Sequence, residues 1–118
     1  NIASKTPITI LENESPAVTA KKMEIYNTEF IFVLSRDRRV KGIVFMEDIM
    51  QLLEQGQHSV TSVLKDAGTI NMNTTMQDIY PALRNARNAL AVVDDRGVFQ
   101  GVITRRSLIS NLAERRTG

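Results

Sequence analysis

The chain has 118 residues, of which 42% are hydrophobic and 24% are charged, and its formal net charge is +2. This composition is typical of a globular protein and excludes a disordered chain. The sequence contains no cysteine, which excludes disulfides, thiol catalysis and thiolate metal sites and fits a reducing compartment. The basic residues are scattered and aromatic residues are few, so the charge gives no reason to expect a nucleic-acid partner.

The longest apolar run is Phe30–Leu34. A segment that crosses a bilayer needs about 20 apolar residues, so no membrane span is expected. Residues 1–11 lack the features of a signal peptide. Because the chain does not begin with methionine, we expect it to be a piece of a longer protein.

The first elements of the chain are a short strand and a helix. Alternating apolar residues at 8–10 predict the strand. Ser15 followed by Pro16 is typical of a helix N-terminus, because the serine hydroxyl caps free amides and proline fits the first helical position. Met23 lies on the side of this helix that we expect to face a core.

A hairpin and a second helix follow. Residues 31–44 contain two apolar runs separated by a polar turn, which predicts a β-hairpin. Gly42 opens the second run and suggests a close backbone approach or a bulge. The next helix is expected over 47–53 and ends at Gly56. Its expected apolar face consists of Ile49, Leu52 and Leu53.

The second half of the chain repeats the hairpin and its helix. Residues 90–103 align with 31–44 without a gap, and each lies 59 positions after its counterpart. Gly101 takes the place of Gly42, and a helix is expected over 107–112. The constant offset over the whole stretch indicates an internal repeat.

The lead-in to the second hairpin resembles the first but differs in length. A strand is expected at 70–72, and Thr74 is expected to cap the following helix, as Ser15 does in the first half. Pro81 falls inside this helix and is expected to kink or shorten it.

The predicted fold class is therefore α/β, or more strictly α+β, with two strand–helix–strand–strand–helix repeats. The expected bounds of the two domains are 5–58 and 62–118. Neither half can cover its own sheet, so we expect the sheets to pack face to face about a pseudo-twofold axis. The residues expected to be buried are Val33, Val44, Val92 and Ile103.

The repeated pattern resembles a pair of CBS domains, also called a Bateman module. It consists of a glycine, two aliphatic residues, a polar or threonine position, two variable residues, an aspartate or serine, and an aliphatic residue. Residues 42–49 and 101–108 both follow it, except that Phe45 takes the polar or threonine position of the first copy. Residues 2–7 and 62–67 further resemble the C-terminal region of ATP-binding subunits of glycine betaine/proline ABC transporters. The chain contains no Gly-x-x-x-x-Gly-Lys-Ser/Thr loop, so the ATPase domain itself is absent from it.

The resemblance also implies a ligand site. In CBS pairs that bind adenine nucleotides, a hydroxyl and a helix N-terminus meet phosphate, and an aspartate binds the ribose. The first copy keeps Asp48 but has Phe45 at the hydroxyl position, while the second keeps Thr104 but has Ser107 at the acid position. We therefore expect weak or absent binding of AMP and ATP, with any affinity on the side of Thr104. The candidate ligand-binding residues are Asp48, Thr104, Arg105, Arg106 and Ser107.

Each of these residues also has an ordinary structural interpretation. An acid near a helix start complements the helix dipole, a threonine or serine there caps the helix, and the arginines can be solvated surface residues. His58 is the only histidine and lies in a polar linker, so no metal site is expected.

By resemblance, the chain is a non-catalytic regulatory module that modulates an osmoprotectant transporter in response to ionic strength or a nucleotide ligand. The resemblance implies no required cofactor. It leaves open whether an adenine nucleotide or cyclic di-AMP is the regulatory ligand. The implied partners are a second copy of the chain, the parent ATPase domain, the membrane subunits and an anionic membrane surface. The implied location is cytoplasmic, peripheral to the inner membrane. The alternative is an adenine-nucleotide-binding CBS pair that belongs to a channel or a metabolic enzyme.

Overall fold

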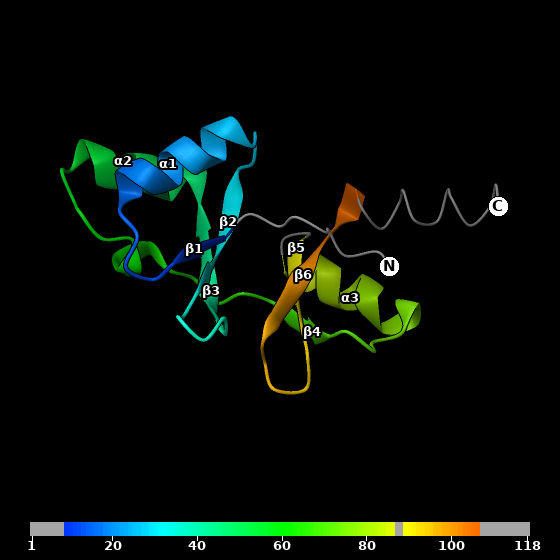
Figure 1. Cartoon of the computed structure of the whole chain (residues 1–118). Helices are drawn as coiled ribbons and strands as arrows, with labels where there is room; N and C mark the ends of the chain where they lie inside the picture. The colour runs from blue at the N-terminus through cyan, green and yellow to red at the C-terminus, as the bar shows by residue number, and fades with distance from the viewer. Residues whose placement is uncertain (1–8, 87–88, 107–118) are drawn as a thin grey trace. The chain divides into compact units, whose positions relative to one another are not determined.

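The computed structural model describes residues 9–86 and 89–106 (Figure 1). Within these ranges the chain forms two compact units, which comprise residues 9–67 and 68–106 without 87–88. The helix expected over 107–112 lies outside the described residues. We describe each unit by itself and call them the first and the second unit.

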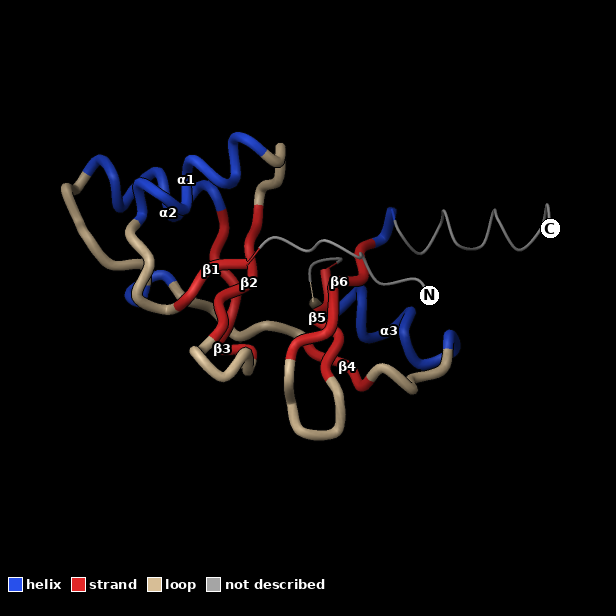
Figure 2. Tube along the Cα trace, in the orientation of Figure 1, coloured by secondary structure: helices blue, strands red, loops and turns tan. Residues whose placement is uncertain are grey.

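The first unit is a three-stranded sheet with two helices on one face. The sheet has the order β1-β2-β3, in which β1 and β2 are parallel and β2 and β3 are antiparallel. Helices α1 and α2 lie side by side over this sheet (Figures 1 and 2). The elements are β1 (Thr9–Leu11), α1 (Pro16–Ile25), β2 (Phe30–Leu34), β3 (Val40–Phe45), α2 (Met46–Glu54) and the 3₁₀ turn η1 (Thr61–Val63).

The second unit has the same order of elements up to its third strand. Its sheet has the order β4-β5-β6, again with a parallel first pair and an antiparallel second pair. The elements are β4 (Thr69–Asn71), α3 (Met76–Asn85), β5 (Ala89–Val93) and β6 (Phe99–Thr104). The expected α+β class and the internal repeat are confirmed.

The residues expected to be buried form the cores of the two units. Val33 and Val44 are fully buried in the first unit, and Val92 and Ile103 are 5% and 3% exposed in the second. In the first unit the strand residues pack against Met23 of α1 and against Ile49 and Leu52 of α2. In the second unit they pack against Ile79 and Leu83 of α3.

Three helix features differ from expectation. The N-cap of α3 is Thr75 instead of Thr74, because the Thr74 hydroxyl instead donates to the Asn71 carbonyl at 2.7 Å in the preceding turn. Pro81 does not shorten α3, which has ten residues, as α1 does. On α2, Leu53 is 37% exposed and does not share the buried face of Ile49.

The starts of α1 and α3 show that the offset between the two repeats differs between the helices and the hairpins. α3 begins 60 positions after α1, whereas β5 begins 59 positions after β2. The connection from α3 to β5 is therefore one residue shorter than that from α1 to β2. An alignment at a single offset of 59 consequently puts the cap one residue too early.

A bulge interrupts both hairpins at the glycine. Val33 pairs with Gly42 and Leu34 with Val40, so Lys41 is the extra residue of β3. The same skip occurs in the second hairpin, where Val92 pairs with Gly101. Such a bulge bends the strand locally and re-aims its side chains.

A short segment that we call the strap, residues 64–66, pairs with β3 beside this bulge. Lys65 and Ile43 exchange two backbone hydrogen bonds of 2.9 Å each. A Cβ atom on Gly42 would lie 2.5 Å from the Lys65 carbonyl oxygen and 2.8 Å from the Leu64 side chain. Gly42 thus combines the bulge and the close approach that its sequence position suggested.

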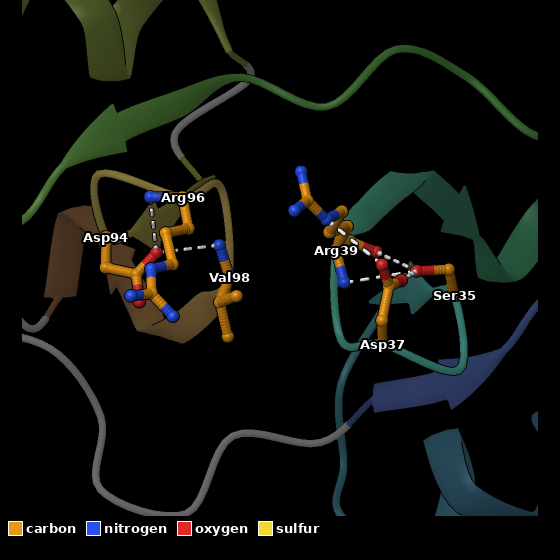
Figure 3. A network of polar contacts seen from close by, with 6 residues as sticks. All are labelled: Ser35, Asp37, Arg39, Asp94, Arg96 and Val98. Atoms are coloured by element: carbon orange, nitrogen blue, oxygen red, sulfur yellow. Dashed lines mark hydrogen bonds and ion pairs between the residues drawn. The ribbon is translucent and has the colours of Figure 1, made fainter.

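The hairpin turns reach one conformation by different contacts (Figure 3). In the second turn, Asp94 Oδ1 accepts the amides of Arg96 and Val98, both at 2.9 Å. In the first, the Ser35 hydroxyl accepts the Arg39 amide at 3.2 Å. The same hydroxyl donates to Asp37, and this hydrogen bond holds the pKa of the Asp37 carboxyl below its ordinary value.

The equivalent residues Arg38 and Gly97 both have positive φ angles, of 65° and 82°. Glycine adopts this conformation freely, whereas a side chain such as that of Arg38 costs about 1 kcal/mol there. The first turn therefore carries a backbone cost that the second avoids.

Candidate functional site

Asp48 lies in the first turn of α2, where β3 passes into the helix without a loop. Phe45 is both the last residue of β3 and the N-cap of α2, and its side chain makes no capping hydrogen bond. The first helical amide, that of Met46, donates to the Glu29 carbonyl at 2.8 Å. This amide is therefore already used and is not free to bind a phosphate.

Asp48 is paired with a lysine from the strap. Its Oδ2 lies 3.0 Å from Lys65 Nζ, and the two side chains are 20% and 45% exposed. This oxygen is buried and receives no hydrogen bond of good geometry, so the contact is an ion pair with poor alignment. The same ammonium lies 5.4 Å from the centroid of the Phe45 ring. It therefore sits within reach of both an anionic carboxylate and the electron-rich face of an aromatic ring.

Sequence reasoning missed Lys65 as a site residue. It lies 17 positions after Asp48, and no spacing rule connects the two. Their proximity results from the pairing of the strap with β3, which places Lys65 opposite Ile43. The sequence indicated this contact only indirectly, since Gly42 predicted that another backbone segment would pass close to β3.

A cavity of about 390 Å³ opens beside the start of α2. Its described lining consists of Glu29, Phe45, Met46 and Glu47. Two carboxylates in this lining oppose the binding of a phosphate and favour a cation.

The other candidate residues belong to the second unit. Thr104 ends β6 opposite Ala89, which is the register position that Phe45 holds opposite Phe30 in the first unit. Thr104 is partly buried, whereas Arg105 and Arg106 are exposed at the start of a helical turn. Ser107 lies outside the described residues. The structure thus confirms that Phe45 and Thr104 are equivalent positions.

The described residues offer no arrangement of three or more His, Cys, Asp or Glu side chains that could hold a metal ion. Over residues 9–86 and 89–106, no helix has the length and apolar character needed to cross a bilayer.

Two units of one repeat, each a β-α-β-β arrangement with a helical start directly after its third strand, define the class of protein. The profile of the CBS domain family matches residues 1–55 and 60–114, and the chain belongs to this family.

Among its relatives is the glycine betaine/carnitine transport ATP-binding protein GbuA of Listeria monocytogenes, which is 27% identical over 114 residues. That alignment covers 96% of this chain and 28% of GbuA. Among solved structures, Staphylococcus aureus OpuCA has a TM-score of 0.81 at 22% identity, with 97% of both chains covered.

Two solved structures with the same fold were determined with adenine-containing ligands. The CBS pair of protein MJ0100 was solved with 5-methylthioadenosine and S-adenosyl-L-methionine, and its TM-score is 0.79 at 21% identity. The alignment covers 97% of this chain and 94% of the MJ0100 chain. CbpB was solved with c-di-AMP, with a TM-score of 0.79 at 17% identity and coverages of 96% and 81%.

Proposed function

We propose that this chain is the non-catalytic regulatory module of the ATP-binding subunit of an osmoprotectant ABC transporter, of the glycine betaine/proline type. The observation that carries the proposal is the similarity to GbuA, which extends over 96% of this chain. The chain spans about 28% of that relative, so the ATPase domain belongs to the rest of the parent protein. In this proposal the two CBS domains span about 5–58 and 62–118.

The module acts by shifting a conformational equilibrium of the transporter in response to ionic strength or a nucleotide ligand. Such a shift requires a stimulus that favours one state of the module over another. The parent ATPase domain and the membrane subunits are its partners, and its location is the cytoplasmic face of the inner membrane.

Deletion of residues 1–118 from the parent subunit tests this function. We expect glycine betaine uptake into proteoliposomes to continue but to lose its dependence on internal ionic strength or on added nucleotide. An uptake that still responds to both stimuli as the intact transporter does would contradict the proposal. ATP hydrolysis by the shortened subunit is the control for its folding.

The proposed ligand residues are Thr104, Arg105, Arg106 and Ser107 of the second unit. Asp48, the candidate of the first unit, contributes little in this proposal, because Lys65 Nζ already lies 3.0 Å from its Oδ2. We expect AMP and ATP to bind weakly or not at all, with any affinity supplied by the hydroxyl and positive charge near Thr104, and cyclic di-AMP stays open as a ligand. Thr104→Ala should then weaken AMP binding about fivefold or more, because one hydrogen bond to a charged group is lost. Asp48→Ala should leave the affinity within twofold.

Titration calorimetry of the native protein and both variants with AMP measures this. Tight AMP binding that Asp48→Ala abolishes and Thr104→Ala leaves unchanged would contradict the proposal, because the ligand would then bind to the first unit.

A second copy of the chain is a further proposed partner. The helices of the first unit expose large apolar side chains: Val18 and Ile25 of α1 are 42% and 64% exposed, and Met50 of α2 is 48% exposed. Apolar surface of this kind favours association. We also propose a contact between the module and an anionic membrane surface.

The alternative is a CBS pair that regulates a channel or a metabolic enzyme by binding an adenine nucleotide. The similarity in fold to the MJ0100 pair, which was solved with S-adenosyl-L-methionine, supports it. The sequence of the parent protein separates the two, because an ABC-type ATPase domain in it supports the transporter.

A further inference from the structure

We infer that Lys65 is a specificity-determining residue: its ammonium group acts as a tethered internal cation that holds Asp48 and closes the first unit to adenine nucleotides. This inference goes beyond the proposed function and concerns the first unit alone. It stands or falls independently of any ligand at Thr104.

The first argument is the state of the Asp48 carboxylate. A carboxylate that binds a ribose diol must present accessible oxygens to two hydroxyl donors. Oδ2 of Asp48 is instead buried and faces Lys65 Nζ at 3.0 Å. A nucleotide would have to displace this ammonium and leave it without its counter-charge, which costs binding free energy.

The second argument is the way in which Lys65 is delivered. Its backbone forms two hydrogen bonds of 2.9 Å with Ile43, so its Cα is fixed by strand pairing. This pairing depends on Gly42, because a side chain there would collide with the Lys65 carbonyl oxygen. Because the backbone is fixed, holding the ammonium near Asp48 costs only side-chain entropy, whereas a lysine on a free surface loop would also lose backbone entropy.

The third argument is the charge of the surroundings. The ring of Phe45 offers its face to the ammonium at 5.4 Å, and Glu29 and Glu47 line the adjacent cavity. The Met46 amide, which could have met a phosphate, is bonded to the Glu29 carbonyl. The carboxylates of the cavity disfavour a phosphate, and the Phe45 ring lies within reach of the ammonium group of Lys65.

The test uses AMP and a background in which the remaining obstacles are removed. Phe45→Thr introduces a hydroxyl at the position that Thr104 holds in the second unit. Thr104→Ala removes the hydroxyl through which the second unit is proposed to bind AMP. In this background we compare Lys65 with Lys65→Met, which keeps the aliphatic stem and removes the charge. Lys41→Met is the matched control, because Lys41 is an exposed lysine on the β3 bulge of the same unit.

Titration calorimetry should show that Lys65→Met raises the AMP affinity of the background at least about tenfold, the effect of one or two hydrogen bonds to a charged group. Adding Asp48→Ala should abolish the gain, and Lys41→Met should produce none. The inference is overturned if Lys65→Met leaves the affinity within twofold, or if the gain survives Asp48→Ala.

A measurement in the otherwise native chain keeps the inference testable if the combined variant does not fold. Asp48→Ala alone should leave AMP affinity within twofold, because the carboxylate is already occupied by Lys65. A loss of more than about fivefold would show an accessible carboxylate and would overturn the inference. If the native chain binds no AMP at all, which agrees with the weak or absent binding expected from its sequence, the Phe45→Thr series alone decides the role of Lys65.

Discussion

Replacement of Ile49 by alanine is expected to lower the free energy of unfolding by about 2–5 kcal/mol. Ile49 is fully buried on the inner face of α2 and packs in the cluster that contains Met23, Val33 and Val44. Removal of its side chain leaves a cavity where helix and sheet meet, and the loss combines transfer free energy with a cavity term.

Urea denaturation followed by circular dichroism measures this loss. Met50→Ala is the matched control, because Met50 is the next residue of the same helix and is 48% exposed. A surface substitution of this kind should change the free energy of unfolding by no more than about 0.5 kcal/mol. Equal losses for the two variants would mean that α2 does not pack on the sheet through Ile49.

Replacement of Gly42 by alanine is expected to cost about 1–3 kcal/mol, because the new methyl group overpacks against a backbone atom. The Cβ would lie 2.5 Å from the Lys65 carbonyl oxygen, so the strap must move away from β3. The two hydrogen bonds between Lys65 and Ile43 should weaken together, and the amides of both residues should exchange faster with solvent.

Hydrogen exchange measured by NMR, together with urea denaturation, checks this result. Gly56→Asn is the control: Gly56 has a φ angle of 68° and no atom within 4 Å of an added Cβ, and asparagine tolerates such a backbone. Unchanged exchange at Lys65 and Ile43 in Gly42→Ala would contradict the close approach.

The sequence was sufficient to predict the elements whose signal is local and repeated. The two hairpins and the four core residues followed from apolar runs at a constant spacing, and the structure confirms them. A single offset of 59 puts the N-cap of α3 one residue too early, because the connection before β5 is one residue shorter than its counterpart before β2. Such a difference falls between the periodic segments and leaves no mark on their pattern.

The candidate site was less predictable. The equivalence of Phe45 and Thr104 followed from the repeat, but the ion pair of Asp48 with Lys65 did not. That contact depends on strand pairing between segments that share no periodic signal, and only the folded backbone brings them together. The ligand-binding roles of Asp48, Thr104, Arg105, Arg106 and Ser107 stay predictions.

The strap also covers part of an exposed sheet edge. β3 is an edge strand of its three-stranded sheet, and an uncovered edge offers its amides and carbonyls as a template for strands of other molecules. By bonding Ile43 in both directions, Lys65 occupies part of that edge and adds a charged side chain there. Lys65 thereby leaves less of this edge open to the strands of other molecules.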